Sequence, residues 1–187
     1  PPNAQPFQMS DRCPECAQPV VKPEGEVATR CINASCPAIL RGSLQHWASR
    51  HGLDIDGLGE KLVQQLVERQ FVRSVADLYE LSVESLTELE RMGRKSAENL
   101  VEAIAQSKQQ PWSRVLYGLG IRYVGRVNAQ TLTQYFTSVD RLAQASIDDI
   151  EAVHGIGEEI ARSVWEWFRV PANQELVERL KAVGLQL

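Results

Sequence analysis

The 187-residue sequence contains no apolar run that approaches the roughly 18–20 residues of a membrane-spanning helix. It also has no signal-peptide pattern, so it predicts a cytoplasmic protein and not a membrane or secreted one. An excess of basic residues is missing as well, because the formal net charge is −4 at pH 7. This balance argues against a globally basic nucleic-acid-binding domain. It leaves local basic clusters open, since a phosphate group feels charge within about 10 Å.

Catalytic motifs are missing too. The sequence has no P-loop, no nucleophile elbow, no His-Glu-x-x-His motif and no Lys-x-Asp-Gly adenylation motif. The acidic residues in helical segments, such as Glu84, Glu88, Asp148 and Asp149, are typical of solvated helix faces. We therefore expect no catalytic residue in this chain, and whether it is part of an enzyme depends on sequence outside it.

Cysteine is scarce and confined to one short segment. Cys13, Cys16, Cys31 and Cys36 form two pairs with spacers of two and four residues, which lets each turn present two thiolates to a tetrahedral Zn²⁺. Disulfides are disfavoured because nothing indicates secretion, and a redox pair is disfavoured because no βαβ pattern surrounds it. We predict one structural zinc ion, beside a ribbon of residues 20–21 and 27–28 that turns at residues 23–25.

The most informative feature that is present is an internal repeat. A five-residue motif that ends in an apolar residue followed by Gly precedes an expected helix at four places. These are residues 55–59, 89–93, 121–125 and 153–157, which we name hairpins 1 to 4. Their last glycines are 34, 32 and 32 residues apart. Each turn places helix N-terminal N–H groups and a helix dipole where they favour a phosphate. Four residues after these glycines stand small or apolar residues that let two helices pack closely: Val63, Ala97, Ala129 and Ala161.

The repeat is itself repeated, because residues 74–89 and 138–153 align at an offset of 64. Serines in equivalent places are expected helix N-caps: Ser74, Ser82, Ser138 and Ser146. The predicted fold is mainly α, with a small four-cysteine zinc finger and short β-ribbon followed by four helix-hairpin-helix motifs in two tandem pairs. We divide the chain into a linker or upstream tail (1–11), the zinc finger (12–42) and the helix-hairpin-helix domain (43–187).

The hairpins differ in local charge. Basic side chains gather at hairpins 2 and 3, whereas hairpins 1 and 4 also carry acidic ones, so we expect hairpins 2 and 3 to supply most of the ionic attraction for DNA. Arg91 and Tyr123 replace the first glycine of hairpins 2 and 3, and we expect those two turns to differ in detail. Contacts to phosphate carry no sequence information, so we predict sequence-independent binding. The candidate DNA-binding residues are Gly57, Gly59, Lys61, Arg91, Gly93, Arg94, Lys95, Arg122, Gly125, Arg126, Gly155 and Gly157.

The order of these parts resembles the C-terminal half of bacterial NAD-dependent DNA ligases, over nearly all of the chain from Cys13 to Leu187. The most specific stretches are residues 31–38 (CINASCPA), 53–61 (LDIDGLGEK), 90–97 (ERMGRKSA) and 117–125 (YGLGIRYVG). The resemblance implies that the four cysteines bind zinc and that the hairpins contact the minor-groove backbone of nicked duplex DNA. Two departures from the family pattern are Ala17, where Gly is common, and Ile39, where Gln is usual.

The same resemblance implies the surroundings of the chain. Adenylation and OB-fold domains, with the catalytic lysine that uses NAD and Mg²⁺, would precede it, and a BRCT domain usually follows in the family. The parent enzyme would seal 5′-phosphate/3′-hydroxyl nicks in replication and repair, in the bacterial cytoplasm and at the nucleoid. Two alternatives stay open from the residues alone: a protein-interaction module of a repair complex, and a module that targets branched DNA.

Overall fold

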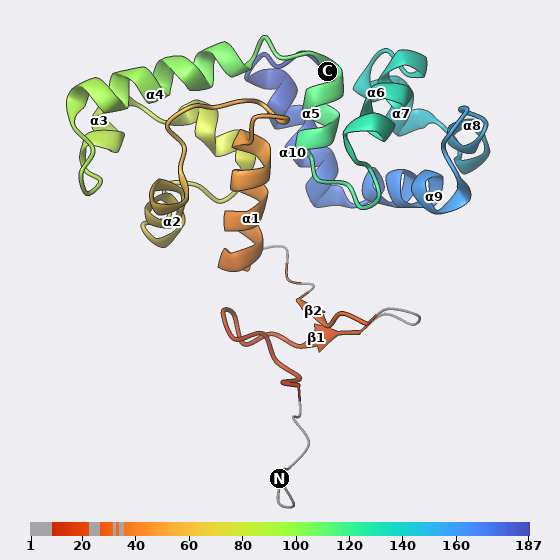
Figure 1. The fold of residues 1–187 in the computed structure, drawn as a ribbon, viewed down its shortest axis with the longest axis horizontal. Helices are drawn as coiled ribbons and strands as arrows, with labels where there is room; N and C mark the ends of the chain where they lie inside the picture. Colours follow the sequence, from red (N-terminus) through yellow and green to blue (C-terminus); the bar gives the residue numbers. More distant parts are fainter. Residues whose placement is uncertain (1–8, 23–26, 32, 34–35) are drawn as a thin grey trace, which may run out of the picture.

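The computed structural model describes residues 9–22, 27–31, 33 and 36–187, and these confirm a mainly helical fold with one two-stranded ribbon (Figure 1). None of the helices in these ranges is both long and apolar enough to cross a membrane. Helices α1, α5 and α10 lie in the middle of the helical part, with the first pair of motifs on one side and the second pair on the other. The division into residues 1–11, 12–42 and 43–187 stays a prediction.

The ribbon differs from the predicted one. Strand β1 (Val20–Val21) pairs antiparallel with β2 (Arg30–Cys31), with Val20 opposite Cys31. The predicted second strand at residues 27–28 is wrong, because pairing three residues later brings Cys31 within 3.6 Å (Sγ to Sγ) of Cys16. The predicted turn at residues 23–25 and most of the predicted linker lie outside the described residues.

The helices follow the repeat. The first pair of motifs contains α1 (Pro37–Ala48), α2 (Glu60–Glu68), the 3₁₀ helix η1 (Val75–Glu80), α3 (Val83–Thr87) and α4 (Arg94–Ser107). The second contains α5 (Trp112–Gly118), α6 (Arg126–Tyr135), α7 (Val139–Gln144), α8 (Ile147–Glu151) and α9 (Glu158–Trp167), and α10 (Pro171–Ala182) follows. Helix α1 begins at residue 37, before the helical pattern predicted from residue 43, because a proline is well suited to the first helical position.

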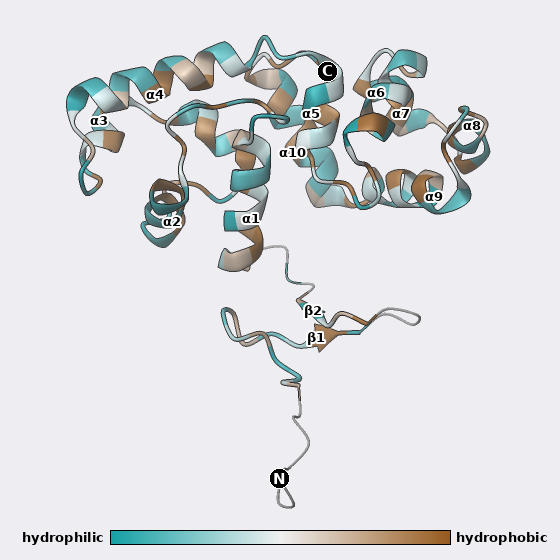
Figure 2. Cartoon of the chain, in the orientation of Figure 1, coloured by the Kyte–Doolittle hydropathy of each residue, from teal (hydrophilic) through white to brown (hydrophobic). Residues whose placement is uncertain are grey.

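Each hairpin joins two helices that pack on one another: α1 on α2, α3 on α4, α5 on α6 and α8 on α9. The predicted packing residues carry these contacts, since Val63, Ala97, Ala129 and Ala161 are fully buried. Small side chains there let the helix axes approach. The outer side of α4 and the hairpin before it are mostly hydrophilic, while the apolar residues turn toward neighbouring helices (Figure 2). The hairpins therefore project from a continuous apolar core.

Serine N-caps hold three short helices: α3, which precedes hairpin 2, and α7 and α8, which precede hairpin 4. The hydroxyl oxygens of Ser82, Ser138 and Ser146 accept hydrogen bonds from the third residue of α3, α7 and α8, as predicted. Asp149 completes a capping box with Ser146. These bonds hold the first helix of hairpins 2 and 4 in place.

Helix α10 links the two pairs. Its Arg179 donates to the Asp77 carboxylate of η1 at 2.5 Å, and its Lys181 donates to Asp140 of α7 at 2.6 Å. Burial tends to raise the Asp77 pKa, but hydrogen bonds from the Arg73 N–H, the Arg179 guanidinium and the Ser74 N–H outweigh it and hold that pKa below its ordinary value. Two charged side chains of α10 thus connect it to both pairs of hairpins.

Candidate metal centre and nucleic-acid interface

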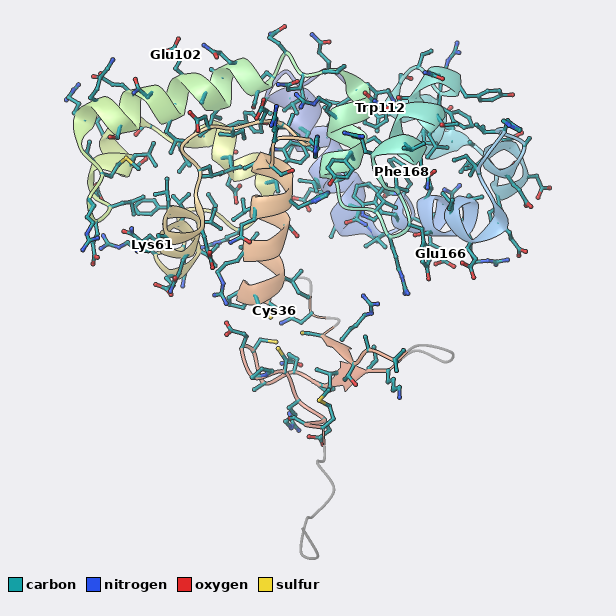
Figure 3. All side chains as sticks on the ribbon, in the orientation of Figure 1. Cys36, Lys61, Glu102, Trp112, Glu166 and Phe168 are labelled. Atoms are coloured by element: carbon teal, nitrogen blue, oxygen red, sulfur yellow. The ribbon has the colours of Figure 1, made fainter. Side chains whose placement is uncertain are left out.

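The four cysteine sulfurs gather at one point of the finger. All four Sγ atoms lie within 4.8 Å of one another, with 3.8 Å between Cys13 and Cys36 and 3.6 Å between Cys16 and Cys31. Cys36 ends the loop before α1, so the cluster sits at the foot of that helix (Figure 3). The turn after Cys13 and the β1–β2 ribbon therefore help to bring together residues up to 23 positions apart.

The spacing fits a tetrahedral zinc ion. Four sulfurs at about 2.3 Å from a central ion are about 3.8 Å apart by geometry. A disulfide needs about 2.05 Å, so neither of these two contacts is a disulfide, and all four cysteines are free. The cluster thus has the ligand number, the ligand type and the separation of a closed structural zinc site.

The surroundings of the cluster shift the pKa values of two thiols in opposite directions. Hydrogen bonds, the largest from the Asn33 side chain and the next from the Gln18 backbone, lower the pKa of Cys16 to about 6. At Cys31 the Asn33 backbone N–H lowers the pKa, but burial and the neighbouring thiols outweigh it and raise the pKa to about 12. Four thiolates this close repel one another, and a divalent cation is the group that would allow all of them to ionise.

Ala17 closes the first knuckle in a left-handed conformation, with φ at 57°. Its N–H donates to the Cys13 carbonyl at 2.9 Å, and the Cys13 N–H donates to the Gln18 carbonyl at 2.8 Å. Glycine adopts such a φ without cost, whereas alanine carries strain of about 1 kcal/mol or more. Glu15 of the same knuckle accepts from Arg41 of α1 at 2.8 Å, which ties the knuckle to the helical part.

All four hairpins share one turn. In each, the N–H of the residue before the last glycine donates to the carbonyl three residues earlier, at 3.0 to 3.5 Å. The residue directly before the N–H donor has a left-handed φ in every copy: Gly57, Arg91, Tyr123 and Gly155. The expectation that hairpins 2 and 3 turn differently is therefore wrong, because Arg91 and Tyr123 adopt the glycine conformation at φ 60° and 65°. The fold therefore holds the backbone of Arg91 and Tyr123 in a strained conformation.

The last glycine of each hairpin is the N-cap of the following helix. Gly59, Gly93, Gly125 and Gly157 have extended backbones with φ between −94° and −75°, which any residue adopts. A Cβ added at these positions meets nothing within 4 Å, and no side chain caps the helix. Neither conformation nor internal packing requires glycine there, so the space in front of the first-turn N–H groups is open to a ligand.

The predicted basic residues surround these openings. Lys61, Arg91, Arg94, Lys95 and Arg126 are exposed, and Lys61 is visible on α2 in Figure 3. Arg94 pairs with Glu98 of its own helix at 3.3 Å and Arg162 beside hairpin 4 pairs with Glu158 at 2.5 Å. The twelve predicted residues lie at four separate turns and not in one pocket. This distribution suits a long, repeating ligand better than a small molecule.

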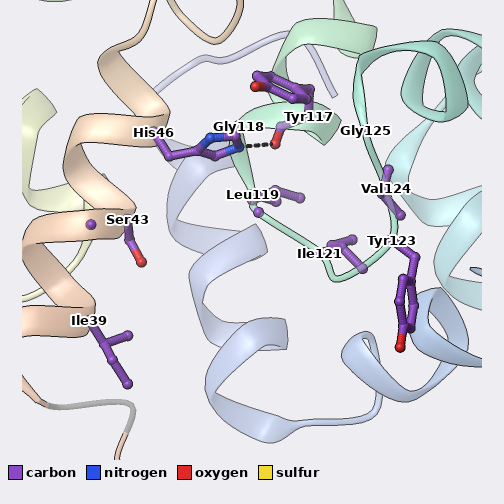
Figure 4. Close-up of a pocket in the computed structure, with 12 residues that line it drawn as sticks. Ile39, Ser43, His46, Tyr117, Gly118, Leu119, Ile121, Tyr123, Val124 and Gly125 are labelled. Atoms are coloured by element: carbon purple, nitrogen blue, oxygen red, sulfur yellow. Dashed lines mark hydrogen bonds between the residues drawn. The ribbon is translucent and has the colours of Figure 1, made fainter. Parts of the chain in front are cut away.

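Hairpin 3 has the most developed surroundings. It lines an open pocket of about 570 Å³ opposite α1, where the His46 imidazole donates from Nε2 to the Tyr117 carbonyl at 2.8 Å (Figure 4). His46 is thus a half-buried bridge between α1 and α5. The exposed ring of Tyr123 carries the Arg122 guanidinium over its face at 4.6 Å. Tyr123 was missed as a candidate, although its place at a glycine position was the available signal.

Comparison with known proteins agrees with this arrangement. Family models match the NAD-dependent DNA ligase C4 zinc finger domain at residues 12–38, a SAM-like helix-hairpin-helix tandem at 51–106 and a helix-hairpin-helix motif at 114–177. The chain is 56% identical to a DNA ligase of Synechococcus sp. (strain WH7803) and 57% identical to a DNA ligase of Parasynechococcus marenigrum (strain WH8102), over 100% of its length in both cases.

The chain matches the C-terminal fragment of an NAD-dependent DNA ligase. The resemblance seen in the sequence is therefore confirmed, as is a four-cysteine zinc finger domain with a cluster able to bind a metal. The chain spans 27% and 28% of the length of these two ligases. The matched regions are the C4 zinc finger and the helix-hairpin-helix motifs.

Proposed function

We propose that this chain is the DNA-clamping part of an NAD-dependent DNA ligase, and that its four hairpins bind the sugar-phosphate backbone of nicked duplex DNA. The observation that carries the proposal is the set of four uncapped helix N-termini, each preceded by a glycine whose missing Cβ leaves open space. A backbone phosphate can approach such N–H groups closely because no side chain intervenes. These contacts ignore base sequence and suit any nick.

Zinc would serve this function indirectly. Cys13, Cys16, Cys31 and Cys36 would hold one Zn²⁺, which supplies a rigid cross-link to a segment with little apolar core. Because Cys36 is the N-cap of α1, the ion would also anchor the helix from which hairpin 1 begins. We assign no catalytic residue to this chain. Adenylation chemistry with NAD and Mg²⁺ would belong to other domains of the same polypeptide, with an OB-fold domain and a BRCT domain as further partners.

A salt titration tests the DNA proposal. Fluorescence anisotropy with a labelled nicked duplex, at several concentrations between 50 and 200 mM salt, gives the number of phosphate contacts from the slope of log K against log salt. The double variant Arg94→Ala/Lys95→Ala should lower the steepness of that slope by about two. Arg73→Ala is a control for the loss of a single charge away from the hairpins, because Arg73 follows the C-terminal end of α2, the end of that helix away from hairpin 1. Unchanged affinity and slope in the double variant would make hairpin 2 a structural element only.

A further inference from the structure

Four residues from three distant segments form a basic cluster beside hairpin 3. The Arg126 guanidinium, at the first position of α6, donates to Nδ1 of His51 at 3.5 Å, across 75 positions of sequence. Arg114 of α5 donates to the carbonyl of Arg50, the residue before His51. The cluster therefore joins the loop after α1, in the first pair of motifs, to α5 and α6 in the second.

The charge of this cluster is uncompensated in the part of the chain that the structure describes. No carboxylate there lies within ion-pair distance of Arg50, Arg114 or Arg126, although eight ion pairs occur elsewhere in the same ranges. Arg114 is only half-exposed, yet its hydrogen-bond partners are neutral oxygens, the Gln110 amide at 2.6 Å and the Arg50 carbonyl. A half-buried guanidinium with neutral partners keeps its full positive charge available to an external anion.

The contact between Arg126 and His51 also favours an external anion as the ligand of this cluster. A guanidinium has no acceptor, so Nδ1 of His51 must carry a lone pair and its proton must be on Nε2. Both side chains are exposed and face solvent together with Arg50. Arg50 and Arg126 are cationic, and the neutral His51 keeps its Nε2–H as a donor, so these exposed side chains supply the charge and the donors that suit a phosphate oxyanion.

We propose that Arg50, His51, Arg114 and Arg126 form a phosphate-binding site that extends from the hairpin 3 opening to the loop after α1. This proposal rests on the proposed function. Its ligand is a backbone phosphate of the same duplex that hairpin 3 binds, since Arg126 directly follows the last glycine of that hairpin. Because the site draws on both pairs of motifs, a bound strand would cross-link them at a place where the protein's own link is the α1–α5 contact.

The test compares two variants with the same loss of charge. Arg50→Ala/His51→Ala removes the exposed half of the site and leaves Arg114 and the hairpins intact, and Arg73→Ala is the control. With nicked duplex, the double variant should lower the steepness of the salt dependence by about one and weaken binding several-fold at 100 mM salt, whereas the control should match the wild type. A wild-type slope in the double variant, with the wild-type chain binding DNA normally, would overturn the phosphate site and leave the proposed function standing.

A second measurement reads the site without DNA. The chain has three histidines, so their imidazole C–H signals are separable by proton NMR. Titration with inorganic phosphate should shift the His51 signal and leave that of His46, whose Nε2 is engaged by the Tyr117 carbonyl, unchanged. A chain that shows the His51 shift but no DNA binding would refute the proposed function alone. Absence of a selective His51 shift would refute the phosphate site.

Discussion

Gly93→Ala separates the stability of the fold from its affinity for DNA. Gly93 is the N-cap of α4 with φ −76°, and an added Cβ meets nothing within 4 Å. Alanine is a poorer N-cap than glycine by about 0.5–1 kcal/mol. It also reduces the entropy of the unfolded chain, which stabilises by about 0.4–1 kcal/mol. The two effects offset one another, so the free energy of unfolding should change by less than about 0.5 kcal/mol.

In the DNA complex, no stabilising effect offsets the effect of the added methyl group on the free energy of binding. The new methyl group would occupy the open space in front of the first turn of α4, where the phosphate must approach the N–H groups. Loss of hydrogen bonds to a charged group costs about 1.5–3 kcal/mol, which corresponds to a roughly 10- to 100-fold weaker complex.

The assay pairs a urea unfolding curve with fluorescence anisotropy on nicked duplex, and Gly155→Ala serves as the contrasting variant. Gly155 has φ 88°, so alanine there should destabilise the fold by about 1 kcal/mol or more. Wild-type DNA affinity in Gly93→Ala would refute the argument that this glycine is present for a ligand. So would a loss of stability larger than about 2 kcal/mol, since the glycine would then be structural.

Three further predictions follow from the finger and from α10. Ala17→Gly should relieve the left-handed strain, stabilise the knuckle by about 1 kcal/mol and slow zinc loss to a chelator, which a metallochromic dye measures; faster loss would contradict it. Removal of zinc should unfold the finger while α2 to α10 keep their helical circular dichroism, whereas a fully folded apo finger would argue against a metal centre. The depressed Asp77 pKa should contribute stability above its ordinary pKa that is lost as the pH falls through the lower folded value, so Arg179→Met should be less stable at pH 7 but lose less stability on acidification.

The repeat made most of the fold predictable. Glycine and alanine positions recur at nearly constant spacing, and each has one local consequence: a helix begins, or two helices approach. The full burial of Ala97, Ala129 and Ala161 reflects this local logic. The cysteine cluster was predictable for a related reason, because two short spacers dictate two knuckles whatever the loop between them does.

What sequence reasoning missed depends on partners far away in the chain. The second strand of the ribbon is displaced because the cysteine cluster, and not the strand propensity of residues 27–28, sets its register. His46 is half-buried because Tyr117, 71 positions later, offers its carbonyl. The strained turns at Arg91 and Tyr123 were missed because side-chain identity suggested a different backbone, whereas the buried neighbours in all four hairpins impose the same one.

The salt dependence of the wild-type chain on nicked duplexes of two unrelated sequences tests the central claim most directly. If four hairpins each engage at least one phosphate, log K should fall with log salt with a slope of about −4 or steeper, and the two sequences should give the same affinity and slope. A slope near zero, or a strong preference for one of the two sequences, would contradict a clamp that holds DNA through its backbone.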